Sequence, residues 1–331
     1  MNKILLVIGL IGIAMTDKEI YRPIDDTIWA GFWNLENFFD PFVDTTLSYN
    51  EFTESGSQHW TSSKFYRKRN HLYKVLVAMS LQHDIGIMGV CEVENEFVLN
   101  SLFGLTPLRR YDFRWVHYEG PDRRGIDPAL IYSKNYFELI DSEAIPYHNK
   151  EDPSFVSRDI IYAKFYDKRG DTLHCFVNHW PSKYSGELET LEARNAAADI
   201  VRQKVDSLFQ YCPSLKVLVM GDFNDTPESP CIQRITSDNI VNLFDSNDLN
   251  FKGTIKYQDK WSVFDQILVS KSLLGKEGLH CIPNEAQIFV KDFMLTDDPT
   301  YHGVKLWRTY VGPRYYGGFS DHLPVCLPLT Y

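Results

Sequence analysis

The sequence predicts an α/β protein with mixed β-sheets, and three observations support this class. Short apolar runs at residues 85–90 and 217–220 are rich in β-branched and aliphatic side chains and are too short for surface helices, so they are expected to be buried strands. Two longer stretches, residues 62–81 and 188–208, carry apolar side chains at helical spacing. Strands and helices alternate early in the chain, whereas later strands pair locally, which favours mixed sheets.

The first half of the chain is predicted to begin with a strand over residues 27–33. A polar loop follows over residues 40–60, and long loops in compact domains are commonly functional. The helix over residues 62–81 carries four basic residues that are expected on its solvated face rather than in a nucleic-acid patch: Arg67, Lys68, Arg69 and Lys74. The strand over residues 85–90 leads into a short helix that is expected to end near Phe103.

The second half contains more strands. Strands over residues 113–118 and 129–132 flank a loop, and residues 160–166 and 172–178 are predicted to form a hairpin. After the helix over residues 188–208, the strand over residues 217–220 is expected to stop at Gly221. Further strands are predicted at residues 264–269, 287–290 and 323–327. Because the sequence has no repeat and no linker composition, residues 22–331 are predicted to form one domain.

The N-terminus has the pattern of a signal peptide. Lys3 precedes an apolar segment over residues 4–15, and polar residues follow. The segment is short of the ~20 residues that span a bilayer. Cleavage after Ala14 is expected to remove residues 1–14, with an uncleaved anchor or a core segment as the alternatives. The prediction is therefore a secreted or periplasmic protein that is not inserted in the membrane after cleavage, is monomeric and has no stable protein partner.

The net charge and the cysteines limit the kinds of protein that the sequence is compatible with. The formal net charge of −10 argues against a protein that coats nucleic acid or membranes non-specifically, although it is compatible with an enzyme that binds phosphate through a cation. Cys91, Cys175 and Cys326 lie in apolar strand-like runs and are expected to be buried thiols. The other three cysteines lie in turn-like surroundings that are compatible with one bridge: Cys212, Cys231 and Cys281.

Polar side chains repeatedly border the predicted strands. Each taken alone could cap a turn or pair with a surface charge, but together they indicate a polar cleft at one rim of the sheets. They are Asn34, Glu36, Glu92, Asp127, Asn178, His179, Asp222, Asn224, Asp265, Asp321 and His322. Carboxylate and amide oxygens without a thiolate site favour a hard cation, Mg²⁺ or Mn²⁺. Two histidines beside strand-end acids or amides fit transfer at phosphorus, where a water must be aligned.

Seven short motifs follow one another in a specific order. They are Trp33-Asn34-Leu35-Glu36-Asn37, Gly89-Val90-Cys91-Glu92-Val93, Arg124-Gly125-Ile126-Asp127, Asn178-His179-Trp180, Gly221-Asp222-Phe223-Asn224, Phe264-Asp265-Gln266 and Ser320-Asp321-His322-Leu323-Pro324. In this order they resemble the endonuclease/exonuclease/phosphatase superfamily of DNase I-like phosphoesterases, and with the leader they indicate a secreted bacterial-type member. The resemblance implies a four-layered α/β sandwich in which two packed mixed β-sheets are flanked by helices.

The resemblance also implies roles for individual residues. Glu92 matches the principal metal-binding glutamate, Asn34 a neighbouring ligand or orienting group, and Asp321 an acid near the same ion. His322 matches a general base or charged stabiliser that Asp265 orients. Asp222 and Asn224 match the pair that positions the nucleophilic water, and His179 matches a second histidine that contacts phosphate. Cys91 and Trp180 stand where many members carry glutamine and leucine, and Asp127 lies at a variable position.

The shared core of this family does not select a substrate. The leading prediction is an exported Mg²⁺-dependent endonuclease with nucleic acid as substrate, because the loop over residues 297–318 is rich in aromatic and basic side chains that are able to stack bases or, alternatively, to pack the loop itself. The first alternative is a lipid or sugar phosphodiesterase or phosphatase on the same core. A non-catalytic binding module is the alternative from another class.

Overall fold

A computed structural model describes residues 26–43, 51–150, 152–183, 186, 188, 190–245 and 249–331. The predicted signal peptide over residues 1–14 lies outside the described residues, as does part of the loop predicted at residues 40–60. Among the described residues, no helix combines the length and apolar character that crossing a bilayer requires.

The first of two large sheets has seven strands, and β1 and β2 are parallel neighbours at its centre. All its other pairings are antiparallel. The path of strands is β13 (His280–Cys281), β19 (Val325–Thr330), β1 (Thr27–Phe38), β2 (Asp84–Val93), β4 (Asp127–Ser133) and β3 (Phe113–His117), with β14 (Gln287–Ile288) also paired to β19.

The second sheet has six strands, of which β7 and β8 are parallel and the rest antiparallel. Its order is β5 (Phe137–Ile145), β6 (Ile160–Asp167), β7 (Thr172–His179), β8 (Lys216–Asp222), β12 (Asp265–Ser270) and β9 (Ile240–Asn242). Three small ribbons complete the strands: β10 (Ile255–Tyr257) with β11 (Lys260–Ser262), β15 (Leu295–Asp297) with β16 (Val304–Leu306), and β17 (Tyr310–Val311) with β18 (Arg314–Tyr315).

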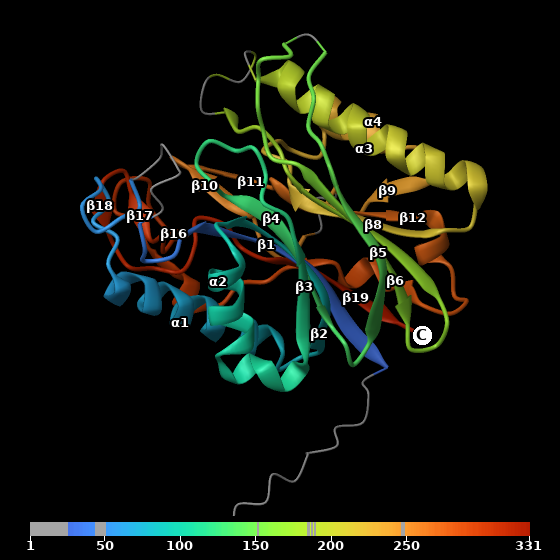
Figure 1. The fold of residues 1–331 in the computed structure, drawn as a ribbon, viewed down its shortest axis with the longest axis horizontal. Coiled ribbons are helices and arrows are strands. Elements are labelled where there is room, and N and C mark those ends of the chain that lie inside the picture. Colours follow the sequence, from blue (N-terminus) through green and yellow to red (C-terminus); the bar gives the residue numbers. More distant parts are fainter. Residues whose placement is uncertain are drawn as a thin grey trace, which may run out of the picture.

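Helices lie outside the two sheets (Figure 1). They are α1 (Ser62–Met79), α2 (Glu96–Leu99), α3 (Leu191–Tyr211) and α4 (Pro230–Ile235), with a π-helical turn at Asn100–Gly104 and 3₁₀ turns at Pro107–Tyr111, Lys271–Leu274, Pro283–Glu285 and Asp292–Met294. Apolar side chains of α3 and α4 pack with the second sheet, and Trp29 of β1 donates its indole N–H to the Met79 carbonyl at the end of α1. Helix, sheet, sheet and helix layers confirm the predicted α/β sandwich.

The inner faces of the sheets meet closely at β2. The Gly89 N–H lies 3.2 Å from the sulfur of Met220 in β8, and a Cβ at position 89 would come within 3.0 Å of Val177 and Met220. Two packed sheets that approach this closely leave no room for a side chain at that point. Glycine is therefore required where the sheets touch.

The structure corrects three predictions. Gly221 does not end its strand: β8 continues to Asp222, and glycine is needed because a Cβ would lie 2.5 Å from the Asn178 carbonyl oxygen on β7. Strand β5 was not predicted, because Phe137–Ile145 is an edge strand with several exposed acidic and polar residues. No disulfide joins the turn cysteines, since all six cysteines, including Cys231 and Cys281, are free.

Candidate active site

The second sheet places three predicted site residues in one row. His179 ends β7, Asp222 ends β8 and Asp265 begins β12. His179 is the register partner of Asp222 across the parallel pair, and Asp265 is its partner across the antiparallel pair. Directly opposed residues on adjacent strands project to the same face of a sheet. The strand register alone therefore gathers an imidazole and two carboxylates.

The first sheet contributes Asn34 and Glu92 through bulged strands. The pairing of β1 with β2 shifts register between Asn34 and Phe38, and that of β2 with β4 shifts between Val90 and Val93. Glu36, with a φ of 52°, and Glu92, with a φ of 60°, have left-handed backbones. A left-handed backbone costs roughly 1–3 kcal/mol in a non-glycine residue, and such residues cluster at functional sites. Bulges beside them redirect side chains.

Hydrogen bonds from Asn34 join the two sheets. Its Nδ2 lies 3.0 Å from Oδ2 of Asp222 and 3.4 Å from Oε1 of Glu92, while its Oδ1 accepts the Glu36 N–H at 2.9 Å. The other oxygen of Glu92 accepts the Asn37 N–H at 2.7 Å. In this arrangement the amide nitrogen of Asn34 faces both carboxylates and orients them.

His322 lies between three carboxylates. Its Nδ1 is 2.7 Å from Oδ2 of Asp265, and its Nε2 is 3.7 Å from Oδ2 of Asp222 and 4.0 Å from Oδ1 of Asp321. Burial alone would lower the pKa of His322, but the charges of Asp265 and Asp222 raise it well above its usual value. His322 is thus favoured as an imidazolium.

His179 has the opposite electrostatic setting. Its Nε2 lies 3.9 Å from Oε1 of Glu92 and 3.8 Å from Oδ2 of Asp222, and burial, reinforced by nearby Arg158, lowers its pKa well below the usual value. The buried Nδ1 of His179 has no hydrogen-bond partner in the described part of the chain. The site thus holds one neutral and one charged imidazole on either side of Asp222.

Asn224 and the backbone fix Asp222. The Asn224 N–H donates to Oδ1 of Asp222 at 2.9 Å, and the Asn224 side chain donates to the Trp180 carbonyl at 2.9 Å. Burial raises the pKa of Asp222 to about 7. With Asp321 near His322, all eight residues predicted for the site lie in one network: Asn34, Glu92, His179, Asp222, Asn224, Asp265, Asp321 and His322.

A buried ion pair behind this network corrects a prediction about α1. Lys68, expected on the solvated face, is buried and lies 3.5 Å from Oε2 of Glu36. Its Nζ also donates to Thr309 Oγ1 at 2.7 Å and to the Phe319 carbonyl at 2.6 Å. Lys68 falls three residues after Phe65, on the apolar stripe of the helix, and this spacing was the signal that its position is internal.

Arg308 is a second residue that the sequence did not single out for the site. Its Nη2 lies 2.8 Å from Oδ2 of Asp321, and its Nε lies 3.7 Å from Oε1 of Glu36. Burial would raise the pKa of Asp321, but Arg308 and His322 lower it below the usual value. Arg308 thereby connects the Lys68–Glu36 pair to Asp321, the candidate metal-binding acid. Glu36 and Arg308 are far apart in the sequence, so no local sequence pattern predicts this contact.

The oxygen donors fit a hard divalent cation. The described residues contain two groups of potential ligands, Cys91–His179–Asp222 and Asp222–Asp265–His322, and within each group the ligand atoms lie within 4.8 Å of one another. Burial raises the pKa of Cys91 well above its usual value, so its sulfur is a protonated thiol, and the second group is already paired internally. The site carboxylates that reach solvent are Glu92, 13% exposed, and Asp321, 19% exposed. Carboxylate oxygens that reach solvent are ligands of the kind that Mg²⁺ or Mn²⁺ takes.

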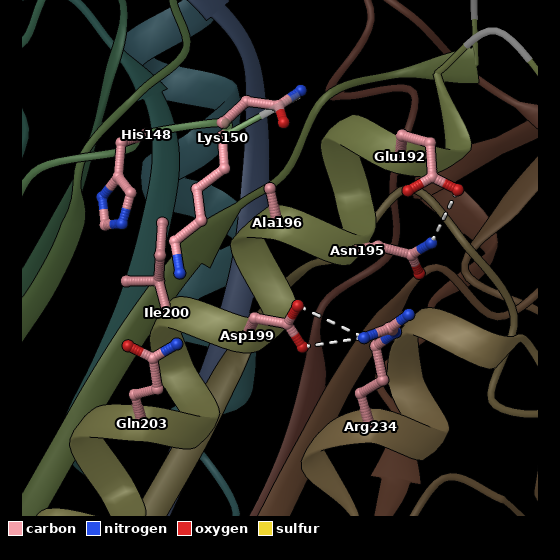
Figure 2. Close-up of a pocket in the computed structure, with 10 residues that line it drawn as sticks. His148, Lys150, Glu192, Asn195, Ala196, Asp199, Ile200, Gln203 and Arg234 are labelled. Carbon is pink, nitrogen blue, oxygen red and sulfur yellow. Dashed lines mark hydrogen bonds and ion pairs between the residues drawn. The ribbon is translucent and has the colours of Figure 1, made fainter. Parts of the chain in front are cut away.

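A cavity of about 250 Å³ lies elsewhere, beside α3 (Figure 2). Side chains of α3 line it together with Lys150 and Arg234, and none of the eight site residues takes part. Asp199 and Arg234 point toward each other across it at 3.0 Å, and both are about half exposed. The Asp199–Arg234 ion pair is solvated, and the motif residues that carry the candidate chemistry lie outside this cavity.

The fold and the site define a class of protein, a phosphoester hydrolase of α/β sandwich architecture. The chain belongs to the Endonuclease/Exonuclease/phosphatase family, whose model matches residues 29–330. A comparison with curated protein sequences finds no match.

Solved structures share the fold at low sequence identity. An endonuclease/exonuclease/phosphatase family protein from Bacteroides thetaiotaomicron is 17% identical with a TM-score of 0.59, covering 92% of this chain and 98% of that one. The mannosyl-6-phosphatase Bt3783 of the same organism is 17% identical with a TM-score of 0.56, covering 92% and 100%. D. rerio TDP2 complexed with single-strand DNA product is 14% identical with a TM-score of 0.57, covering 93% and 100%.

Proposed function

We propose that the protein is an exported, Mg²⁺-dependent endonuclease that hydrolyses phosphodiester bonds of nucleic acids. The observation that carries the hydrolytic part is the convergence of Asp222 with His179 on one side and the Asp265–His322 pair on the other. This arrangement supplies an oriented carboxylate for a nucleophilic water and a cation for developing phosphate charge. Family membership supports hydrolysis of phosphoesters in general.

Glu92 and Asp321 would hold the cation. When bound, Mg²⁺ or Mn²⁺ would polarise a phosphate oxygen and stabilise the leaving oxygen. Asn34 keeps Glu92 and Asp222 in fixed orientations through its amide nitrogen. Arg308, 2.8 Å from Asp321, limits the charge repulsion among the acids before a cation arrives.

The remaining side chains act on the substrate. Asp222, held by Asn34 and the Asn224 N–H, aligns the water. His322, held by Asp265 through Nδ1, presents Nε2 to a phosphate oxygen. His179 offers a neutral imidazole beside Glu92 for a second phosphate contact.

Nucleic acid is proposed as the substrate because of the loop over residues 297–318. Much of this loop packs on itself, since Tyr310 is buried and Lys64 lies 4.7 Å from the centre of the Tyr315 ring. Tyr301 and Tyr316 nevertheless remain 44% exposed, and Arg314 lies 5.0 Å from the Tyr316 ring centre. Exposed aromatic rings beside arginine are suited to stacking bases. The similar TDP2 structure contains single-strand DNA product.

A substrate panel tests the proposal. Duplex DNA, single-stranded DNA, RNA, bis-p-nitrophenyl phosphate and p-nitrophenyl phosphate are incubated with the protein in Mg²⁺, Mn²⁺ or EDTA. We expect cleavage within the polymers and of the diester, with loss of both in EDTA. Cleavage confined to p-nitrophenyl phosphate would replace the nuclease with a phosphatase.

Export rests on the apolar segment over residues 4–15 that follows Lys3. Expression of the full chain in a bacterial host, followed by mass spectrometry of the extracytoplasmic fraction, is expected to yield a chain beginning at residue 15. Recovery of only the full-length chain in the cytoplasm would refute the export.

A further inference from the structure

Two arginines approach the site from loops that belong to different sheets. Arg124 lies three residues before β4, and Asp127 at the start of β4 is the register partner of Val93, the residue after Glu92. Arg158 lies two residues before β6, where Ile161 pairs with Val177, two residues before His179. Because β4 and β6 run antiparallel to β2 and β7, they begin at the rim where Glu92 and His179 end their strands.

The two arginines meet at Asp122. The Nε of Arg158 lies 3.1 Å from Oδ2 of Asp122, and the Nε of Arg124 lies 3.8 Å from Oδ1. The Arg124 N–H donates to the same Oδ1 at 2.9 Å, which fixes the loop. One carboxylate thus faces two guanidinium groups, so these three side chains together carry a net charge of +1.

Arg158 is held with unused hydrogen-bonding capacity. Its side chain is only 9% exposed, and its Nε makes no well-directed hydrogen bond within the described part of the protein. An unsatisfied buried N–H of a guanidinium is unfavourable, so Arg158 relies on its ion pair with Asp122, and a phosphate would add to its partners. Arg124 is 35% exposed, which leaves its guanidinium open to solvent beside Arg158. Arginine forks of this kind match the oxygens of phosphate.

The order of strands separates this pair from the proposed reaction centre. In the second sheet the neighbouring strands are, in spatial order, β6, β7, β8 and β12. His179 lies on β7, Asp222 on β8 and Asp265 on β12. At ~4.8 Å between neighbouring strands, the backbone of β6 lies about 10 Å from that of β8. The arginines therefore lie beyond His179, on the side of Asp222 opposite to His322, where a group next to the scissile phosphate would fall.

We propose that Arg124 and Arg158 bind a second phosphate group of the substrate, next to the one that is cleaved. This rests on the proposed function, and it makes the pair a determinant of specificity: a polynucleotide supplies the second phosphate, and a simple diester with one phosphate does not. Asp122 acts as a positioning residue that holds both guanidinium groups and is displaced in part when phosphate binds.

Substrates with one phosphate or several test the inference. Arg124→Gln and Arg158→Gln are each expected to lower kcat/KM on an oligonucleotide by about 10- to 100-fold, the range for losing hydrogen bonds to a charged group. The change should lie mainly in KM. On bis-p-nitrophenyl phosphate, which has no second phosphate, the loss in kcat/KM should be much smaller than on the oligonucleotide in both variants. The matched control is Arg123→Gln, because Arg123 is the exposed neighbour in the same loop and lies outside the pair.

Two outcomes would overturn the inference: equal losses on both substrates, which would place the arginines at the scissile phosphate or in the scaffold, or no loss on the oligonucleotide. If Arg158→Gln fails to fold, Arg158→Lys keeps the charge and removes the fork, and the exposed Arg124 tests the site independently.

A binding measurement separates this inference from the proposed function. Pyrophosphate is titrated calorimetrically into EDTA-treated protein, which requires no turnover. Affinity at least tenfold weaker in Arg158→Gln than in wild type, with Arg123→Gln unchanged, supports the site even if no nucleic acid is cleaved. Equal affinities in all three proteins would overturn it, whatever the substrate panel shows.

Discussion

Lys68 offers a sharp test of the buried scaffold behind the site. Its ammonium is buried against Glu36, Thr309 and the Phe319 carbonyl. Lys68→Met keeps most of the length of the side chain but removes the buried cation beside the Glu36 carboxylate. Breaking a buried ion pair by removing one partner costs about 3–5 kcal/mol, because the remaining charge stays desolvated. The Thr309 N–H and Arg308 still face the Glu36 carboxylate, so the expected loss lies toward the lower end of this range.

Urea unfolding followed by tryptophan fluorescence measures this loss. For a slope of about 3 kcal/mol per M, the expected cost lowers the midpoint by about 1–1.7 M. Arg69→Met is the control on the same helix, since the hydrogen bonds of Arg69 go to the neighbouring Asn70. The double variant Glu36→Gln/Lys68→Met should recover part of the stability. A shift in Lys68→Met no larger than that of Arg69→Met would refute the reasoning.

Three further predictions concern the sheets and the site. Asp265→Asn removes the charged acceptor 2.7 Å from His322 and should lower kcat by about 10²- to 10⁴-fold; a loss below tenfold would contradict the role of the pair. Gly221→Ala should lower the free energy of unfolding in urea by about 1–3 kcal/mol, because the new Cβ would contact the Asn178 carbonyl. An unchanged urea midpoint would argue against that close approach. Burial lowers the pKa of His174 to about 4, below its unfolded value of about 6.5. The free energy of unfolding should therefore be highest above pH 6.5, where His174 is neutral in both states, and should decrease as the pH falls toward 4, because the unfolded state binds the proton more readily. His174→Gln should flatten that part of the stability profile, and an equally steep profile in the variant would assign the acid sensitivity to other groups.

The central strands and long helices were predictable because their sequences carry the pattern of burial. The run at Val217–Met220 is apolar throughout, as a strand covered on both faces requires, and α1 shows its apolar stripe. Strand β5 escaped prediction because an edge strand is only partly covered and tolerates the acidic residues of Phe137–Ile145. Gly221 was misread because its role depends on a contact with Asn178, 43 positions earlier, rather than on local turn chemistry.

The candidate site was predictable as a set of residues but not as a geometry. Strand-border polar residues and the ordered motifs selected the eight side chains that the structure brings together. Bulges at Asn34 and Val90, and the left-handed backbone of Glu92, follow from strand pairing and leave no local signal. The link from Glu36 to Thr309 joins residues 273 positions apart. The single-domain boundary at residues 22–331 and the export of the chain stay predictions.

The most direct test of metal-dependent phosphoester hydrolysis at this site is the rate of bis-p-nitrophenyl phosphate hydrolysis by wild type and Glu92→Ala, in Mg²⁺ and in EDTA. The control is Glu138→Ala, which removes an exposed acid on edge strand β5. We expect EDTA to abolish wild-type turnover, Glu92→Ala to be inactive in Mg²⁺ with an unchanged circular dichroism spectrum, and Glu138→Ala to match wild type. An unchanged rate in folded Glu92→Ala would contradict the account.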